Sequence, residues 1–417
     1  MSTHAGAPNT LRARCCIAGG GPAGVMLGFL LARAGIGVVV LEKHKDFFRD
    51  FRGDTIHPST LELMHELGLL DEFLKVPHQE VRELGAQIGD SFLRVADFTH
   101  LPTVCKFIAL MPQWDFLNFL AERGRHYAGF ELRTEAEVTD LLFDGERVAG
   151  VRATTPHGPL DVRADLVVGA DGRHSVVRAK GGLKVTEIGA PIDVLWMRVS
   201  RRPDDPGQTF GRVNLGKVLI MINREDYWQC AFVIRKGGFD GIRKRGLPAF
   251  RDEVAALAPF LRERLEELRD WDDVSLLTVA VDRLERWYRP GLLCIGDAAH
   301  AMSPVGGVGI NLAIQDAVAA ANILVPAFAK ARVGVAALRA VQRRRAFPAA
   351  LTQCLQVLVQ ERMLSRVLGS DGRPSTPPLP LRLIDRWPFL RRFPAFAVGI
   401  GPRPEHIRTR EAGSSQL

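Results

Sequence analysis

The stretch from Cys15 to His44, CCIAGGGPAGVMLGFLLARAGIGVVVLEKH, most constrains how this chain folds. An apolar run at 15–18, a helical pattern at 22–34 ending at Gly35, and a second apolar run at 38–41 predict a strand, a helix and a strand. The glycines of the first turn fit the pattern GxGxxG, which admits a pyrophosphate at the helix N-terminus. Glu42 closes the second strand, where its carboxylate can accept ribose hydroxyls and repel a 2′-phosphate. The stretch predicts a dinucleotide site and leaves open whether the dinucleotide carries a nicotinamide or a flavin.

The composition excludes several other classes of protein. The chain has 417 residues, 47% of them hydrophobic, which favours two or three domains. The six cysteines form no CxxC pair, so neither a disulfide framework nor a metal site is expected. The net charge of +8 is spread along the chain without aromatic-basic interleaving, which argues against nucleic-acid binding. The N-terminus has no apolar signal core and no segment has about 18 uninterrupted apolar residues, so we expect a cytoplasmic protein without a membrane span.

The rest of the chain changes its pattern twice. Between about 190 and 235, alternating strands indicate an antiparallel sheet, and the strand at 291–295 returns to the apolar, parallel style. The expected elements are helices at 59–67 (with Ser59 as N-cap), 114–127, 247–268, 311–331 and 335–368, and strands at 131–133, 136–143, 148–155, 164–169, 217–223, 227–234, 275–281 and 291–295. The chain therefore leaves a nucleotide-binding domain and comes back to it.

Two later segments each follow an apolar strand. Asp171–Arg178, DGRHSVVR, comes after the strand at 164–169, although a turn with an N-capped helix behind it would also explain this segment. Gly296–Asn311, GDAAHAMSPVGGVGIN, comes after the strand at 291–295. Asp297 can hydrogen-bond a ribityl hydroxyl, the glycines let the backbone close on a planar ring, and the helix beginning near Asn311 directs its positive end at that ring. Such segments make sense only around a cofactor that extends past the pyrophosphate, which favours FAD.

The three segments together resemble the single-component (group A) FAD-dependent monooxygenases of the p-hydroxybenzoate hydroxylase type. Arg52 falls where that family carries an FAD-contacting arginine before a PxTLE helix, and Gln113 precedes Leu117 as in the family's cofactor-contacting pattern. The resemblance implies an α/β fold with a discontinuous Rossmann-like FAD-binding domain, a second substrate domain built on an antiparallel β-sheet, and C-terminal helices. The implied boundaries are 12–80, 103–185 and 283–368 for the FAD-binding domain, 81–102 and 186–282 for the substrate domain, and 369–417 for a C-terminal connector and helical tail.

The resemblance also implies which residues bind the cofactors. FAD is held by the chain, and NADPH or NADH binds transiently as electron donor at a surface that includes the Asp171-Gly172 segment. The predicted cofactor-binding residues are Gly19, Gly21, Pro22, Ala23, Gly24, Glu42, Lys43, Arg52, Gln113, Asp171, Gly172, Arg178, Gly296, Asp297, Pro304, Gly309, Ile310 and Asn311. The loop containing Pro304, Gly306 and Gly307, here called the flavin-ring loop, is expected to lie nearest the chemistry.

The implied reaction uses NAD(P)H and O2 to hydroxylate or otherwise oxygenate a small molecule through a C4a-hydroperoxyflavin. The apolar strands at 217–222 and 230–234 suggest a hydrophobic aromatic or polycyclic substrate. The sequence offers no convincing substrate base. His57 is one candidate, although it also reads as a loop residue beside Pro58. The others are Arg198, Asn223, Tyr227 and Arg235, for which solvent exposure or packing is the preferred explanation.

Other functions share parts of this pattern. A flavin-dependent dehydrogenase or reductase of the geranylgeranyl-reductase type is the main alternative. A flavin-dependent halogenase is disfavoured because its WxWxIP signature is absent, and a flavin-less protein-binding relative is disfavoured because the glycine cluster, Glu42 and Asp297 are all present. The tail from 381 to 400 mixes aromatic residues with arginines, which favours a helix packed on the protein's own surface over weak contact with a membrane. The sequence leaves the oligomeric state open.

Overall fold

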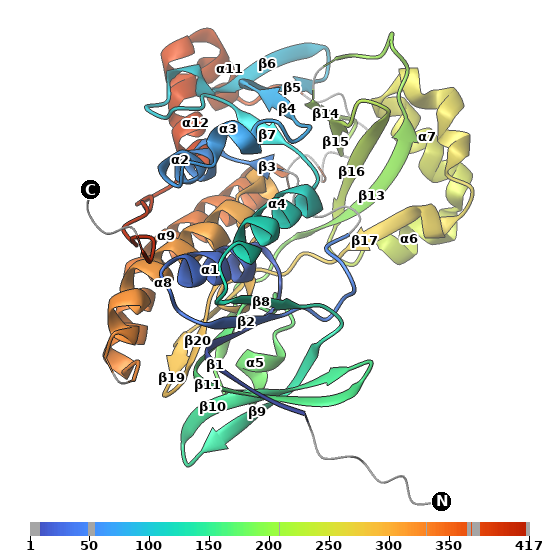
Figure 1. Cartoon of the computed structure of the whole chain (residues 1–417). Coiled ribbons are helices and arrows are strands. Elements are labelled where there is room, and N and C mark those ends of the chain that lie inside the picture. The colour runs from blue at the N-terminus through green and yellow to red at the C-terminus, as the bar shows by residue number, and fades with distance from the viewer. Residues whose placement is uncertain are drawn as a thin grey trace, which may run out of the picture.

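The first of two large sheets carries the Gly-rich stretch, in a computed structural model that describes residues 9–48, 55–207, 209–330, 332–364, 368 and 376–413. Its parallel strands run in the order β20 (Leu292–Cys294), β11 (Gly158–Gly169), β1 (Asn9–Ala18), β2 (Val38–Leu41) and β8 (Phe130–Arg133). β19 (Tyr288–Arg289) pairs antiparallel with β20, and the hairpin of β9 (Glu137–Asp144) and β10 (Arg147–Thr155) extends from β11 (Figure 1). The apolar runs of β1, β2 and β20 are buried, as expected for parallel strands covered on both faces.

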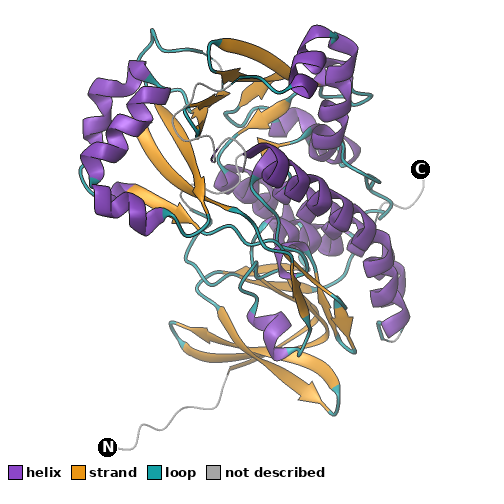
Figure 2. Ribbon diagram, turned by 180° about the vertical axis from the view of Figure 1, so that it is seen from behind, coloured by secondary structure: helices purple, strands orange, loops and turns teal. Residues whose placement is uncertain are grey.

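Helices stack on this sheet in successive layers. α1 (Pro22–Arg33) packs on β1, β2 and β8, and α4 (Gln113–Arg125) lies beside α1. α8 (Gly309–Phe328) packs on α1, and α9 (Val335–Val359) packs on α8 (Figures 1 and 2). The short α5 (Val176–Lys180) lies against β9.

The segment Val305–Phe328, which includes α8, has the length and hydropathy of a membrane span, the one such helix within the described ranges. Its most apolar window is 67% buried inside the protein, and α8 lies between α1 and α9. Packing between two helices therefore accounts for its apolar composition.

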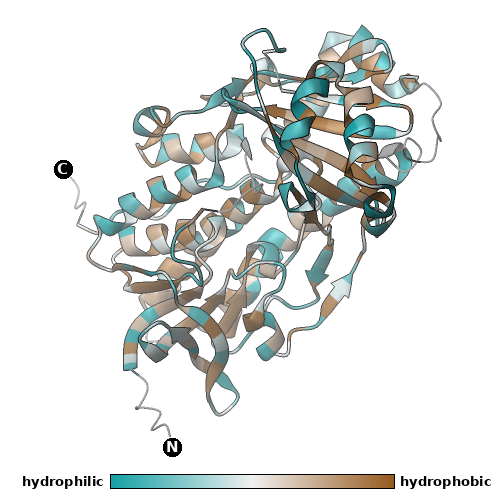
Figure 3. Cartoon of the chain, turned by 90° about the vertical axis from the view of Figure 1, so that its right-hand side faces the viewer, coloured by the Kyte–Doolittle hydropathy of each residue, from teal (hydrophilic) through white to brown (hydrophobic). Residues whose placement is uncertain are grey.

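The second sheet has seven strands, in the order β17 (Val274–Leu277), β13 (Ile192–Ser200), β16 (Tyr227–Arg235), β15 (Lys217–Asn223), β14 (Phe210–Asn214), β5 (Glu83–Ile88) and β6 (Ser91–Asp97). Neighbouring strands are antiparallel except for β14 and β5. α6 (Phe239–Arg245), α7 (Leu247–Leu257) and the 3-10 segments η2 (Pro259–Glu267) and η3 (Trp271–Asp273) cover one face, where Figure 3 shows apolar strands under helices with hydrophilic outer sides. The predicted α/β fold with an antiparallel second sheet is thus confirmed, while the exact domain boundaries remain a prediction.

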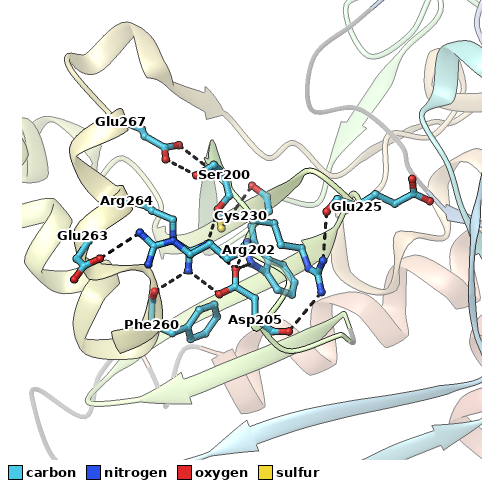
Figure 4. Close-up of polar contacts among 11 residues, drawn as sticks. Ser200, Arg202, Asp205, Glu225, Cys230, Phe260, Glu263, Arg264 and Glu267 are labelled. Atoms are coloured by element: carbon cyan, nitrogen blue, oxygen red, sulfur yellow. Dashed lines mark hydrogen bonds and ion pairs between the residues drawn. The ribbon is translucent and has the colours of Figure 1, made fainter.

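A buried ion pair ties the second sheet to its covering helices. Arg264 donates from its two terminal nitrogens to Asp205, over 2.6 and 2.7 Å, and Trp228 Nε1 donates to the same carboxylate over 2.8 Å (Figure 4). Burial alone would raise the pKa of Asp205, but these hydrogen bonds and the Arg264 charge outweigh it and lower the pKa to about 2. This pair contacts none of the predicted cofactor residues. It can therefore be compared with the buried ion pair of Asp316 and Arg345, which is described below.

Shorter elements connect the two sheets and position the loops between them. β3 and β4 pair with β7, β12 pairs with β18, and the C-terminal helices α11 and α12 pack on β6. The bounds are β3 (Thr55–Ile56), α2 (Pro58–Glu66), α3 (Leu70–Phe73), β4 (Gln79–Val81), η1 (Phe98–His100), β7 (Ile108–Leu110), β12 (Val185–Glu187), β18 (Asp282–Leu284), η4 (Gly296–Ala298), η5 (Val305–Gly307), η6 (Gln360–Leu364), α11 (Leu379–Arg386), η7 (Pro388–Arg391) and α12 (Arg392–Gly399).

After α12 the chain runs back along the helices of the first sheet. Asn322 on α8 donates to the carbonyl of His406, and Arg33 on α1 donates to the carbonyl of Thr409. The N–H of Ala412 returns a hydrogen bond to the carbonyl of Arg33. The C-terminal segment is therefore fastened to the nucleotide-binding side of the molecule.

Three predicted elements have different ends in the structure, and proline accounts for two of them. α2 begins at Pro58 with His57 as N-cap, so Ser59 lies inside the helix; proline suits the first helical position because it has no N–H to satisfy. The helix predicted at 247–268 ends at Leu257, because Pro259 interrupts the hydrogen-bond ladder and starts a 3-10 segment. The strand predicted at 275–281 is limited to β17, Val274–Leu277.

Candidate functional site

The three predicted segments meet where β1, β11 and β20 end. Because these strands are parallel neighbours, their carboxyl ends lie at the same edge of the first sheet. A Cβ added to Gly19 would lie only 2.3 Å from the carbonyl oxygen of Ala170, so the Gly-rich turn touches the start of the Asp171 segment. A Cβ added to Gly296 would lie 3.2 Å from the Cβ of Ala23, so the third segment touches the first turn of α1. The fold thus brings the three segments into contact from across the sequence.

The N-terminus of α1 has the form required for a pyrophosphate. Gly21 is its N-cap and Pro22 its first residue, so the amides of Ala23 and Gly24 lie in the turn that has no intrahelical acceptors. A Cβ on Gly24 would lie 1.9 Å from the carbonyl oxygen of Gly19, which enforces close packing of the turn on the helix. A Cβ on Gly21, in contrast, would meet no atom within 4 Å. That open space is where a phosphate can approach the backbone, so the residues present fit the diphosphate of FAD.

Glu42 lies at the end of β2 beside this turn. Its carboxylate accepts hydrogen bonds from the N–H of Gly20 over 2.9 Å and from the N–H of His44 over 3.0 Å, and its side chain is largely buried. These bonds fix the carboxylate next to the Gly-rich turn, where an adenosine ribose would follow the diphosphate. Lys43, the next residue, is exposed.

The Gly296-Asp297 turn rests on a buried charged network that the sequence analysis did not identify. The N–H of Gly296 donates to Asp316 on α8 over 3.1 Å, and the same carboxylate contacts His300 Nε2 at 2.5 Å and Arg345 Nε at 2.9 Å. Arg345 also faces Glu405 of the C-terminal segment at 3.4 Å. Burial would raise the pKa of Asp316, but His300 and Arg345 outweigh it and the pKa lies below its ordinary value.

Asp297 itself points outward from this supported turn. Its side chain is 33% exposed and lies 3.8 Å from Arg173 of the second segment. The network below and the partly exposed side chain above suit a residue that contacts the ribityl part of the cofactor.

The sequence contains a signal for the buried network, because Asp316 is the one carboxylate within the apolar run 312–321.

The flavin-ring loop is held by the segment that precedes α2. Gly306 and Gly307 have φ values of +79° and +63°, and a Cβ on Gly307 would lie 2.4 Å from Thr55 Oγ1. Thr55 donates from its hydroxyl to the carbonyl of Gly307 over 2.9 Å. Asn311, at the start of α8, accepts from the N–H of His57 and from the hydroxyl of Thr60, each over 2.8 Å, and donates to the carbonyl of Thr55. Asn311 therefore fixes the loop against the start of α2, and its contact with the cofactor stays a prediction.

α8 begins at Gly309, directly after this loop, and Ile310 is partly exposed there. The positive end of a 20-residue helix dipole therefore faces the loop. Pro304, the residue before η5, is also partly exposed. This arrangement favours negative charge on a ring placed against the loop.

The second segment is more structural than expected. Asp171 accepts from Ser175 Oγ over 2.5 Å and from the N–H of Val177 over 3.1 Å, so it supports the N-cap of α5, which is Ser175. Burial raises the pKa of Asp171, and these hydrogen bonds only partly offset the effect. Arg178 pairs with Asp282 at 3.2 Å with both side chains nearly buried, and its role at the cofactor surface stays a prediction. Gly172, with a φ of +82°, lies in the turn that connects β11 to α5.

His57 is not an accessible base. Its side chain is fully buried, its Nδ1 bonds the carbonyl of Val398 over 2.7 Å, and its Nε2 has no hydrogen-bond partner among the described residues. Burial lowers the pKa of His57 to about 4, an effect that the bond to Val398 only partly offsets. The imidazole is therefore neutral near pH 7 and enclosed.

The four polar candidates of the second sheet are also engaged elsewhere. Arg198 lies over the ring of Tyr227, with 3.8 Å between guanidinium carbon and ring centroid, and both line a cavity of about 490 Å³ together with residues of η2 and η3. Asn223 accepts from the N–H of Glu225 in the turn between β15 and β16 and donates to the carbonyl of Gly207 before β14, and Arg235 donates to the carbonyl of Leu368. Arg52 lies outside the described residues, and Gln113 is the partly exposed first residue of α4.

Beside the flavin-ring loop lies an apolar wall made by both the second sheet and α12. Val305 packs with Val194, Val218 and other apolar residues of the sheet face opposite α7. Val398 of α12 belongs to a cluster with Trp196 and Ile222, and a Cβ on Gly306 would lie 3.8 Å from Val398 Cγ2. The contribution of α12 could not be recognised in the sequence, because about 90 residues separate it from the loop that it touches.

Comparisons with known proteins identify the family of this chain. The FAD binding domain family matches residues 12–354. The 6-methylpretetramide 4-monooxygenase of Streptomyces rimosus is 33% identical over 388 residues, which cover 90% of both chains. Rifampicin monooxygenase of Streptomyces venezuelae is 30% identical over 336 residues, 72% of this chain and 61% of the relative. Among solved structures, the OxyS anhydrotetracycline hydroxylase of S. rimosus superposes with a TM-score of 0.73 at 24% identity, covering 93% of this chain and 76% of that one.

Proposed function

The chain belongs to the FAD-dependent monooxygenases of the p-hydroxybenzoate hydroxylase type, and from this premise we propose that it uses NAD(P)H and O2 to hydroxylate a polycyclic aromatic small molecule. Its relative at 33% identity is named for a monooxygenation of 6-methylpretetramide, and another relative is named for rifampicin. The observation that carries the substrate class is the apolar wall beside the flavin-ring loop, formed by Val305, Trp196, Ile222 and Val398.

The chain's own residues fix where the cofactor lies. When bound, FAD supplies the redox chemistry, accepting a hydride from the reduced nicotinamide and using O2 to oxygenate the substrate. The amides of Ala23 and Gly24 hold the diphosphate, the carboxylate of Glu42 holds the adenosine ribose, and Asp297 holds the ribityl chain. Gly306 and Gly307 let the backbone lie flat against the ring.

Electrostatics and exclusion of water are the contributions nearest the reaction. The N-terminal end of α8 stabilises negative charge on the ring, because the dipole is already oriented before charge develops. The apolar side chains of Val305, Trp196 and Val398 keep water from the space beside the ring, which protects a reactive oxygen species from being lost as peroxide. His57 takes no proton from the substrate in this proposal, because its imidazole is enclosed. The proposal includes a cytoplasmic location, because the proposed reaction consumes NAD(P)H.

A coupled assay tests the proposed function. The purified holoenzyme is incubated with a panel of fused-ring phenols and with small monocyclic phenols while NAD(P)H oxidation and O2 uptake are followed together. We expect fused-ring substrates to stimulate both rates, and ¹⁸O₂ to place one labelled oxygen in the product. Reduction of a substrate double bond without O2 uptake would instead indicate the reductase alternative, and a halide-dependent halogenated product would indicate a halogenase.

A further inference from the structure

The C-terminal helices present a concentrated apolar surface to solvent. Seventeen large hydrophobic side chains among the described residues are exposed, and six of them lie within 18 residues of one another. The most exposed of these six are Phe393 (69%), Leu379 (65%) and Phe389 (59%). We call the six the C-terminal apolar surface: Leu379, Leu383, Trp387, Phe389, Phe393 and Phe396. Scattered single exposures are ordinary, but a cluster of this density is typical of an interaction site.

The opposite side of the same helices is anchored, so the exposure is a property of the fold. Ala395 and Gly399 of α12 are buried, and a Cβ on Gly399 would lie 2.7 Å from Leu101 Cδ1. On α11, Asp385 accepts from the N–H of Arg94 on β6 over 2.9 Å. In Figure 1 these helices lie beside β6 at the outer edge of the molecule. The prediction that the tail packs on the protein's own surface therefore describes only its inner side.

The charge on this surface has one sign. Arg382, Arg386 and Arg392 are exposed within the same segment. The one carboxylate between Leu379 and Gly399, Asp385, faces Arg391 at 3.5 Å in addition to the backbone of β6. Exposed tryptophan, phenylalanine and leucine interleaved with arginine form the pattern of segments that lie in the interface of a bilayer.

From this combination we propose that the C-terminal apolar surface docks the enzyme on an anionic lipid bilayer. The aromatic side chains enter the headgroup region while the arginines face the lipid phosphates. Association with a second copy through a two-fold axis would oppose arginine to arginine, because such an interface must be self-complementary and this surface has no exposed carboxylates to match its cations. This lipid binding does not depend on the substrate class proposed above.

The inner side of α12 connects this surface to the candidate active site. Val398 lies beside Gly306 of the flavin-ring loop, and its carbonyl bonds His57. The helix that carries Phe393 and Phe396 outward thus forms part of the apolar wall inward. Docking would place the apolar wall close to molecules dissolved in the membrane.

Co-sedimentation of the full-length holoenzyme with vesicles tests the proposal. We expect binding to vesicles of phosphatidylcholine and phosphatidylglycerol in equal parts, and weak binding to phosphatidylcholine alone. The double change Arg382→Glu and Arg386→Glu should raise the apparent Kd by roughly fivefold or more per arginine, since each basic residue contributes about 1 kcal/mol at an anionic surface. The change Phe393→Ser with Phe396→Ser should abolish binding to both kinds of vesicle.

Matched variants control for charge and for exposed aromatic area. Arg283→Glu with Arg286→Glu makes the same change in net charge at exposed positions in and after β18 and should reduce binding far less. Phe143→Ser removes a 43%-exposed ring from β9, at the opposite end of the molecule in Figure 1, and should leave binding unchanged. FAD content and far-ultraviolet circular dichroism verify that each variant is folded.

Three results would overturn the proposal. One is the absence of vesicle binding by the wild type at low ionic strength. Another is an equal loss of binding in the control and test variants. The third is a concentration-dependent dimer in sedimentation velocity that the Phe393 and Phe396 changes abolish without affecting vesicle binding, which would make the surface an interface between copies of this chain.

Discussion

Replacing Asp316 by asparagine tests whether the buried network positions the Gly296-Asp297 turn. The change keeps the shape of the side chain but removes its charge. Arg345, which is 1% exposed, would keep Glu405 at 3.4 Å as its carboxylate partner among the described residues, and His300 would lose its carboxylate partner. Breaking a buried ion pair from one side costs about 3–5 kcal/mol, a large part of the roughly 5–15 kcal/mol that stabilises most domains.

The effect on the cofactor is separate from the effect on stability. The N–H of Gly296 loses a charged acceptor, and a hydrogen bond to a charged group is worth about 1.5–3 kcal/mol. If that energy holds the turn that presents Asp297, the Kd for FAD should rise by about 10–100-fold. Titration of the apoprotein with FAD, followed by flavin fluorescence, measures this value, and urea unfolding measures the stability.

Asp205→Asn is the matched control, because Asp205 and Arg264 form another buried ion pair, located between the second sheet and its covering helices (Figure 4). We expect a comparable loss of stability with the FAD Kd within about twofold of wild type, since well-separated sites act independently. If Asp316→Asn loses as much stability as Asp205→Asn but binds FAD as tightly as wild type, Asp316 serves only the fold and our explanation is wrong.

Two further predictions concern the glycines of the first segment and His57. Gly21→Ala should fold like wild type, because its Cβ would meet no atom within 4 Å, but it should weaken FAD binding by roughly tenfold or more. Gly24→Ala should lower the free energy of unfolding by about 1–3 kcal/mol, because its Cβ would lie 1.9 Å from the carbonyl oxygen of Gly19. Equal FAD affinity for Gly21→Ala and wild type would contradict the placement of the diphosphate. The pKa of His57 falls from 6.5 to about 4 on folding. The neutral His57 therefore favours the folded state above pH 6.5 by about 3 kcal/mol relative to low pH. This contribution is lost as the pH falls toward 4, because the unfolded chain takes up the proton first. His57→Gln should therefore flatten the stability profile between these pH values, and an unchanged profile in urea unfolding would show that His57 is not buried and neutral.

The features predicted correctly from the sequence are those whose causes are local or follow from parallel strands. The Gly-rich turn, its flanking strand and helix, and Glu42 lie within 30 residues, so their periodicity and spacing were sufficient. The Asp171 and Asp297 segments were grouped with this turn by the cofactor that they would need, and the structure explains their meeting, because parallel strands end at one edge. The antiparallel second sheet was equally visible, because its strands alternate and are joined by short turns.

The contacts that the sequence could not predict are made by residues far away along the chain. Arg178 forms an ion pair with Asp282, 104 positions later, and His57 is hydrogen-bonded to the carbonyl of Val398, 341 positions later. Neither partner leaves a mark on the local pattern of Arg178 or His57. Pro259 is different, because its effect on the helix predicted at 247–268 is local and a stricter use of proline as a helix breaker would have found it.

The cofactor content of the purified protein tests the central claim most directly. The protein is denatured, and the released flavin is identified by chromatography and quantified against the protein concentration. We predict one FAD per chain, in the purified protein or after reconstitution, bound at the meeting point of the three segments. A colourless protein that FAD cannot reconstitute, although it is folded, would contradict the account.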